Sequence, residues 1–282
     1  MLETFHRVAS RIRHSRFLDD LGIWEKVEPY WQQTFVRLSR HHGFSTCINE
    51  DIFKLEYAFG SRYDRSDNRR YEPVFYRAFV EQIEQGMTVF DIGAHIGLLT
   101  LGAAKRVGRN GRVYAFEPSP ETAKILERHI CLNRWQDRAE VVKAVVSDVA
   151  AVVPFYIYGV SMAASLGKEN VEALNPEQPN AAVKIDVPSV TLDEFCKGRN
   201  IKPAIMKIDV EGAELQVLRG AKDLLLNESL SVLCEIHPRQ MQYCRSSLPQ
   251  LEAYLDSVGY GSKSLDQPNE TGIFHSLITR RE

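Results

Sequence analysis

The segment Val-Phe-Asp-Ile-Gly-Ala-His-Ile-Gly, residues 89–97, decides how this chain is expected to fold. Residues 87–92 form a short apolar run of strand length, and Gly93 permits the tight turn that follows it. Gly97 lets a helix begin directly against the strand, and apolar residues at helical spacing continue to Gly108. The first N–H groups of that helix have no partner within the helix, so they can face a ligand. We expect a strand–turn–helix unit with a ligand at the turn; a purely structural turn is the alternative.

Outward from this unit, short apolar runs alternate with segments of helical periodicity. The further parallel strands are expected at 113–116, 141–146, 205–210 and 230–236. The helices are expected at 73–86, 98–108, 119–133, 192–196, 247–258 and, with Leu215, Leu218 and Leu225 on one side, after the fourth parallel strand. Residues 152–158 are expected to lie antiparallel beside the third strand, and 183–187, 260–265 and 272–279 are further strands. Such alternation is typical of an α/β doubly wound, mostly parallel sheet with both faces covered.

The first 70 residues have a different pattern. Helices are expected near 2–17 and 24–41, extended stretches around 44–60, and a solvated loop at 62–70. We interpret residues 1–70 as an N-terminal cap or appendage, and residues 71–282 as the main α/β domain.

Composition limits the class of protein. The 282 residues are 44% hydrophobic and carry a formal net charge of −2, so no general attraction to nucleic acid is expected. Five scattered cysteines without a C-x-x-C argue against a disulfide framework or a thiolate metal site and fit a reducing cytoplasm. The chain has no apolar run of about 18 residues. We expect a cytoplasmic protein.

The ends of the first three strands carry candidate cofactor residues. Asp91 lies two positions before Gly93, and this is not the G-x-G-x-x-G of dinucleotide sites. A carboxylate there suits an ammonium or sulfonium better than two phosphates. Glu117, followed by Pro118, ends the second strand, where an acid accepts hydrogen bonds from ribose hydroxyls. Ser147-Asp148, after the third strand, is placed for an adenine amino group or is an ordinary turn.

Ionisable residues gather at the ends of the fourth and fifth strands. These are Asp209, Glu211, Glu235 and His237. Each costs desolvation unless it is paired, and Lys207 shares a strand face with Asp209 and can supply part of the pairing. Glu214 is expected in the first turn of the next helix, where a structural interaction with the helix dipole and a functional role both stay open.

Four blocks of the chain, VFDIGAHIG, AFEPSP, IMKIDVEGAELQVLRGA and CEIHP, resemble the FkbM family of methyltransferases. The resemblance covers about residues 71–240, and the D-V-E-G-A-E block is specific to the family. It implies a Rossmann-like fold of the class I methyltransferase type, S-adenosylmethionine as cofactor, and methylation of hydroxyls on sugars, glycolipids or natural products. The expected cofactor-binding residues are Asp91, Gly93, Ala94, His95, Gly97, Glu117, Pro118, Ser147 and Asp148. The expected acceptor-side residues are Asp209, His237, Glu211, Glu235 and Lys207. Residues 1–70 are a natural place for acceptor specificity.

Two mechanisms stay open for the acceptor hydroxyl. In one, His237 acts as general base, with Asp209 as the rival base or as the group that orients His237. In the other, Asp209, Glu211 and Glu235 hold Mg²⁺, Ca²⁺ or Mn²⁺, which acidifies the hydroxyl. A capping or packing role for His237 is the structural alternative.

Four further alternatives concern the activity, the acceptor atom and the location of the protein. An NAD-type oxidoreductase is disfavoured by the missing third glycine, and a non-catalytic binding module by the acids at four strand ends. A nitrogen acceptor is not excluded by any of these residues. A basic amphipathic helix at residues 5–17 would either touch the inner membrane surface or pack on the domain with a solvated face.

Overall fold

The computed structural model describes residues 42–56, 58–59, 71–158, 165–166 and 182–281, together with positions 30 and 37. It divides into two compact units, which are described separately: Met1–Pro73 with Arg128–Arg134, and Val74–Glu127 with Trp135–Glu282. The expected helices at 2–17 and 24–41, the amphipathic segment 5–17 and the loop 62–70 lie outside the described residues, apart from isolated positions. Among the described helices, none is long and apolar enough to cross a membrane.

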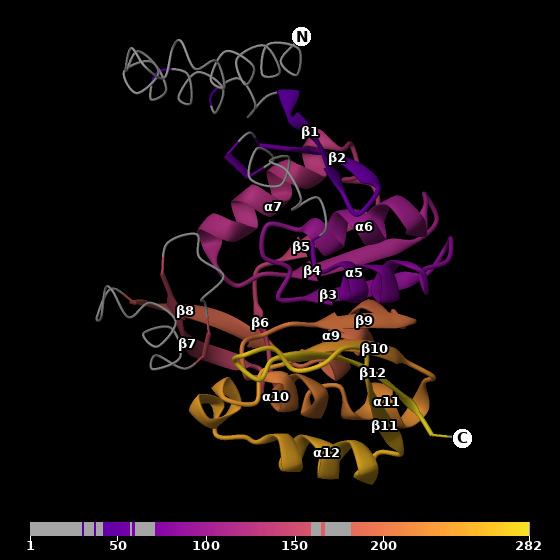
Figure 1. Cartoon of the computed structure of the whole chain (residues 1–282), viewed down its shortest axis with the longest axis vertical. Coiled ribbons are helices and arrows are strands. Elements are labelled where there is room, and N and C mark those ends of the chain that lie inside the picture. Colours follow the sequence, from indigo (N-terminus) through magenta and orange to yellow (C-terminus); the bar gives the residue numbers. More distant parts are fainter. Residues whose placement is uncertain are drawn as a thin grey trace. The chain divides into compact units, whose positions relative to one another are not determined.

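A seven-stranded sheet forms the larger unit (Figure 1). Its strands, in spatial order, are β5 (Ala139–Val142), β4 (Arg112–Phe116), β3 (Thr88–Ile92), β9 (Ile205–Ile208), β10 (Ser231–Ile236), β12 (Phe274–Arg280) and β11 (Tyr260–Ser264). The first five are parallel, and β12 runs antiparallel to both of its neighbours. The predicted doubly wound, mostly parallel Rossmann-like sheet is confirmed. The strand order reverses between β3 and β9, which is where such sheets bind ligands.

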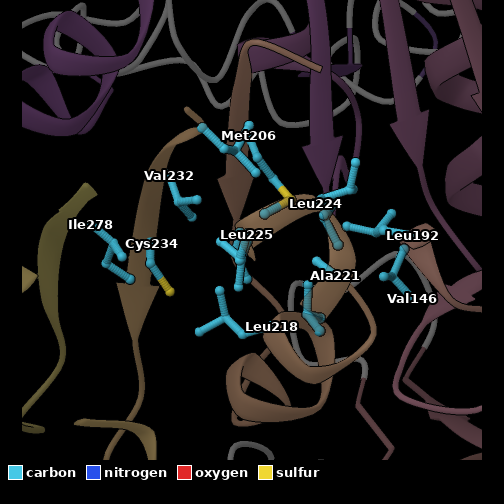
Figure 2. Close-up of a cluster of buried hydrophobic side chains, with 14 of the residues drawn as sticks. Val146, Leu192, Met206, Leu218, Ala221, Leu224, Leu225, Val232, Cys234 and Ile278 are labelled. Carbon is cyan, nitrogen blue, oxygen red and sulfur yellow. The ribbon is translucent and has the colours of Figure 1, made fainter. Parts of the chain in front are cut away.

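Helices connect these strands. They are α5 (Pro73–Val80), α6 (Leu98–Val107), α7 (Pro120–Leu132), α9 (Leu192–Arg199), α10 (Glu214–Arg219), α11 (Lys222–Asn227) and α12 (Leu248–Ser257), with a short 3₁₀ helix, η2, at Gln240–Cys244. Figure 2 shows side chains of the sheet, such as Met206 and Val232, facing Leu218 and Leu225 of α10 and α11. Each such buried aliphatic side chain contributes about 1.5–3 kcal/mol relative to exposure. This core holds the strand ends that carry the ionisable residues.

The expected third strand at 141–146 was wrong in its extent. The chain leaves the main sheet after β5, and β6 (Val145–Val146) pairs with β8 (Val183–Val190) in a separate three-stranded sheet. β7 (Ala151–Ile157) is antiparallel to β8 and not to the third strand. The apolar run is nearly continuous through both short strands, so periodicity could not show that it changes sheets.

The single helix expected after the fourth strand was also wrong, because it is two helices. Gly220 ends α10, and its carbonyl accepts a hydrogen bond from the N–H of Asp193 instead of continuing the helix. A Cβ at Gly220 would lie 2.0 Å from the Ser147 carbonyl oxygen. Leu215, Leu218 and Leu225 are nevertheless all buried. The close approach of residues 147 and 220 therefore sets the break.

The smaller unit contains a β-hairpin, as the expected extended stretches suggested. β1 (Phe44–Ile48) pairs antiparallel with β2 (Asp51–Leu55) through the turn Asn49-Glu50, whose φ values are 46° and 77°. Positive φ at both central residues is typical of a two-residue hairpin turn. Within this unit, the Asn133 side chain binds the backbone N–H and carbonyl of Lys54 at 2.9 and 2.8 Å.

Gly220→Ala is expected to lower the free energy of unfolding by about 1–3 kcal/mol, because its methyl group would overlap the Ser147 carbonyl. Gly198→Ala is the matched control, since a Cβ there meets nothing within 4 Å and Gly198 lies in α9. The control is expected to stabilise the protein by about 0.5–1 kcal/mol. Urea unfolding measures both, and equal stabilities of the two variants would contradict the packing described here.

Candidate active site

Asp91 lies at the base of the turn between β3 and α6. Its side chain is fully buried, and Oδ2 accepts a hydrogen bond from the Thr100 hydroxyl at 2.5 Å. The Nζ atom of Lys207 lies 3.2 Å from Oδ1. The carboxylate is thus held by residues of α6 and β9, under the turn, and its direct contact with a cofactor stays a prediction.

Lys207 connects this turn with the acceptor side. Its side chain is 2% exposed, and Nζ donates to the carbonyls of Ile92 and Gly93 at 3.3 and 2.6 Å. Nζ also lies 3.5 Å from Asp209 Oδ2, which is the pairing expected from their shared strand face. A buried ammonium needs such compensation, because taking an ion out of water is costly.

The two glycines of the turn are required by packing as well as by conformation. Gly93 has a φ of +75°, and a Cβ there would lie 1.7 Å from the Asp209 carbonyl oxygen. Gly97 has a φ of +92°, and a Cβ there would lie 2.1 Å from a methyl carbon of Leu126. Ala94 and His95 lie between them, and His95 also has a positive φ of 50°. The turn can therefore lie directly against the end of β9.

Glu117 is the acid at the end of β4. One carboxylate oxygen accepts from the N–H of His95 at 2.9 Å and the other from the N–H of Ser119 at 2.8 Å, across Pro118. Burial raises the pKa of Glu117 to about 7, although the two backbone hydrogen bonds oppose this shift. Each carboxylate oxygen can accept a second hydrogen bond. The side chain is therefore held in place beside the turn with acceptor capacity to spare.

Ser147 and Asp148 follow β6 and not a strand of the main sheet. The Ser147 hydroxyl donates to Asp148 Oδ1 at 3.2 Å, and the Ser147 carbonyl packs on Gly220. The adenine contact expected for this pair stays a prediction.

The neighbouring strands β9 and β10 bring together four of the expected acceptor-side residues, besides Lys207, as expected from consecutive parallel strands. His237 is 1% exposed, and its Nε2 atom lies 3.6 Å from Glu211 Oε2, 3.6 Å from Glu235 Oε1 and 3.9 Å from Asp209 Oδ1. The side chains of the three acids are 16–19% exposed. We call Asp209, Glu211, Glu235 and His237 the acceptor cluster.

Two pKa values in the acceptor cluster are strongly shifted. Burial opposes protonation of His237, but the hydrogen bond and charge of Glu214, with the charges of Glu211 and Asp209, outweigh it and raise the pKa to about 10. Burial also raises the pKa of Glu211 to about 7, while the charge of His237 lowers it. The cluster is therefore a buried set of mutually dependent charges.

Glu214 orients His237, a role that the sequence had suggested for Asp209. Its Oε1 lies 2.8 Å from His237 Nδ1 and also accepts from the N–H of Gly212 at 2.9 Å. Glu214 is fully buried at the start of α10. The sequence signal for this role was the position of Glu214 in the D-V-E-G-A-E block. An interaction with the helix dipole could also explain a glutamate at that position, so the sequence left both roles open.

His275 is a second imidazole near Glu235, and no sequence pattern had indicated it. On β12 it faces Glu235 of β10 in the antiparallel register, and its Nε2 lies 3.8 Å from Glu235 Oε2. Asp266 Oδ2 lies 2.5 Å from its Nδ1, and Phe75 stacks on its ring at 4.4 Å. No local motif marks His275, because its position depends on the register of a distant strand.

The turn after Asp209 places Glu211 in the left-handed region, with a φ of 53°. Gly212 follows with a φ of 103°, and a Cβ there would lie 2.6 Å from backbone atoms of Gln240. The Ser165 hydroxyl donates to the Glu211 carbonyl at 3.2 Å. A non-glycine residue in a sparsely populated backbone region costs on the order of 1–3 kcal/mol and is typical of functional turns.

Comparison with known proteins gives the same family as the sequence motifs. The family model described as "Methyltransferase FkbM domain" matches residues 91–261. Methyltransferase sdnD of Sordaria araneosa is 28% identical over 61% of this chain and 73% of its own length. The hexuronic acid methyltransferase AglP of Haloferax volcanii is 27% identical over 57% of this chain and 60% of its own length. The 31-O-demethyl-FK506 methyltransferase FkbM of Streptomyces tacrolimicus is 28% identical over 71% and 83%.

A solved structure of methyltransferase FkbM from Methylobacillus flagellatus is similar to 70% of this chain, with a TM-score of 0.48 and 16% identity. The matched region spans only 44% of that protein. The family model covers more than half of the 282 residues and includes both the glycine turn and the acceptor cluster. The chain therefore belongs to the FkbM family of methyltransferases.

Proposed function

We propose that this chain is an S-adenosylmethionine-dependent methyltransferase that methylates a hydroxyl oxygen of a sugar, glycolipid or natural-product acceptor. The observation that carries the proposal is that one side chain joins the glycine turn, the expected cofactor site, to the acceptor cluster. Lys207 contacts both Asp91 and Gly93 at the glycine turn and Asp209 of the acceptor cluster. The names of two relatives, a hexuronic acid methyltransferase and a 31-O-demethyl-FK506 methyltransferase, support an acceptor of this kind.

The residues around the turn fit the cofactor. Gly93 and Gly97 let the turn pack closely against Asp209 and Leu126, and Glu117 beside the turn has acceptor capacity for two ribose hydroxyls. When bound, S-adenosylmethionine supplies a methyl group already activated by its positively charged sulfur. The chain itself must then align the acceptor oxygen and take up its proton.

The acceptor cluster suits the second task. His237 is 1% exposed, whereas the side chains of the three carboxylates around it are 16–19% exposed. An acceptor hydroxyl that enters from solvent therefore contacts the carboxylates before it reaches the imidazole. We assign Asp209, Glu211 and Glu235 to bind the hydroxyl and take up its proton. Asp209 lies nearest the cofactor half, since its carbonyl packs against Gly93.

Glu117→Gln is expected to weaken S-adenosylmethionine binding at least tenfold in a calorimetric titration. The amide cannot accept from the N–H groups of both His95 and Ser119 and also from two ribose hydroxyls. Glu121→Gln is the matched control, because Glu121 is an exposed acid at the start of α7. Equal affinities of wild type and Glu117→Gln would remove the ribose contact from the proposal.

The affinity for S-adenosylmethionine is expected to rise with pH, because the ionised carboxylate of Glu117 accepts the ribose hydrogen bonds. With a pKa of about 7, Glu117 is mostly protonated at pH 6 and mostly ionised at pH 8. This change corresponds to about a tenfold difference in affinity if Glu117 alone responds. Titrations at both pH values of wild type and Glu117→Gln measure it, and the variant is expected to lose the pH-dependent part.

Cofactor affinity is expected to rise with pH, but the raised pKa of Glu117 makes the stability of the folded protein fall with pH. In the unfolded state Glu117 has its ordinary pKa of 4.5, whereas in the folded state its pKa is about 7. Between about pH 4.5 and 7, Glu117 is therefore protonated in the folded state and ionised in the unfolded state. Ionised Glu117 therefore destabilises the cofactor-free protein above pH 7, and this penalty disappears below pH 4.5. The amide of Glu117→Gln does not titrate, so the unfolding temperature of wild type is expected to fall relative to that of Glu117→Gln as the pH rises from about 5 to about 8. A difference between the two proteins that stays constant over this range would contradict the direction of the pKa shift.

Asp209→Asn is expected to lower kcat by about 100-fold or more, because removing a group that handles the proton commonly costs this much. Release of S-adenosylhomocysteine is measured with a panel of hexose, uronic acid, hydroxylated macrolide and amine acceptors. Cofactor affinity is expected to change little, and Glu252→Gln on α12 is the control because Glu252 is exposed. Methyl transfer confined to amine acceptors would contradict the oxygen assignment.

A further inference from the structure

We propose that Asp209, Glu211 and His237 bind a divalent cation of the Mn²⁺ type at the acceptor end of the site. Each of these residues offers one ligand atom, and the three atoms lie within 4.8 Å of one another. This set differs from the one expected from the sequence, since His237 takes the place of Glu235. The binding itself does not depend on the proposed methyl transfer, although the role assigned to the cation does.

The separations between the ligand atoms fit a common ion. His237 Nε2 lies 3.6 Å from Glu211 Oε2 and 3.9 Å from Asp209 Oδ1. Ligands at about 2.0–2.3 Å from a cation are separated by about 3–4 Å, depending on the angle between them. Small side-chain movements would therefore bring all three atoms to bonding distance.

His237 supplies a second, independent observation. Its ring is 1% exposed, and Nδ1 is fixed by Glu214 at 2.8 Å. Nε2 points among three carboxylate oxygens but is beyond hydrogen-bonding distance of all of them, at 3.6–3.9 Å. An imidazole whose other nitrogen is held by a carboxylate is the usual arrangement of a metal-binding histidine. Glu214 is therefore the positioning residue of the site.

The charge of the cluster also favours a cation. Asp209, Glu211, Glu214 and Glu235 surround the single imidazole of His237. Lys207 contacts Asp209 through Oδ2, which leaves Oδ1 directed to the imidazole. Partly buried carboxylates this close repel one another unless positive charge lies between them, and a bound cation would supply that charge in place of the proton on His237, which it releases.

The ligand types indicate which cation would bind. Carboxylate oxygens suit Mg²⁺, Ca²⁺ and Mn²⁺, whereas imidazole nitrogen favours transition metals, so a mixed set selects Mn²⁺ over Mg²⁺. Three protein ligands leave open coordination positions. If the proposed function holds, the acceptor hydroxyl occupies one of them, the cation lowers its pKa, and Glu235, which is not a ligand, takes up the proton.

The test is a titration of the metal-stripped, full-length protein with Mn²⁺, in which free Mn²⁺ is followed by electron paramagnetic resonance. Wild type is expected to bind one Mn²⁺ per chain. His237→Gln and Asp209→Asn are each expected to weaken binding at least tenfold, and Glu252→Gln, in an exposed acid, is expected to leave it unchanged. Circular dichroism and S-adenosylmethionine titration show that each variant is folded. If His237→Gln does not fold, Asp209→Asn still decides, since Asp209 is 19% exposed.

Two results would overturn the proposal. One is wild-type protein that binds S-adenosylmethionine but no Mn²⁺ below millimolar concentration. The other is equal Mn²⁺ affinity in wild type, His237→Gln and Asp209→Asn. Site-specific Mn²⁺ binding without S-adenosylmethionine binding would instead support the cation site and contradict only the proposed function.

Discussion

The rest of the site depends on the buried ammonium group of Lys207. It lies 3.2 Å from Asp91 and 3.5 Å from Asp209, and it donates to the backbone carbonyls of Ile92 and Gly93. Removing one partner of a buried ion pair leaves an uncompensated charge and costs about 3–5 kcal/mol. This one side chain therefore holds the ends of β3 and β9 in a fixed relation.

That relation matters because β3 and β9 flank the reversal of strand order, where the proposed cofactor and acceptor halves of the site meet. Methyl transfer is an in-line displacement, so the two halves must be aligned before reaction. Asp209 takes part in both: its carbonyl packs against Gly93, one carboxylate oxygen faces Lys207, and the other faces His237. The position of the acceptor cluster therefore depends on how Asp209 packs against the glycine turn.

The hydrophobic pattern and the motifs of the sequence were sufficient to predict the parts of the fold that depend on residues close together in the chain. The turn at residues 89–97 and the meeting of the ends of β9 and β10 follow from consecutive β–α units. Long-range pairing was not predictable in this way. β6 continues the apolar run of β5 but pairs with β8, and His275 reaches Glu235 only through the register of β12. Glu214 was visible in its motif, but only the structure shows that it contacts His237.

The most direct measurement combines urea unfolding with calorimetric titration of S-adenosylmethionine for Lys207→Met. We expect this variant to lose about 3–5 kcal/mol of unfolding free energy, because Asp91 stays buried without its cation. We expect the affinity for S-adenosylmethionine to fall at least tenfold. The double variant Lys207→Met with Asp91→Asn is expected to recover part of the stability, since the unpaired charge is removed. Wild-type stability and affinity in Lys207→Met would contradict the dependence of the site on this contact.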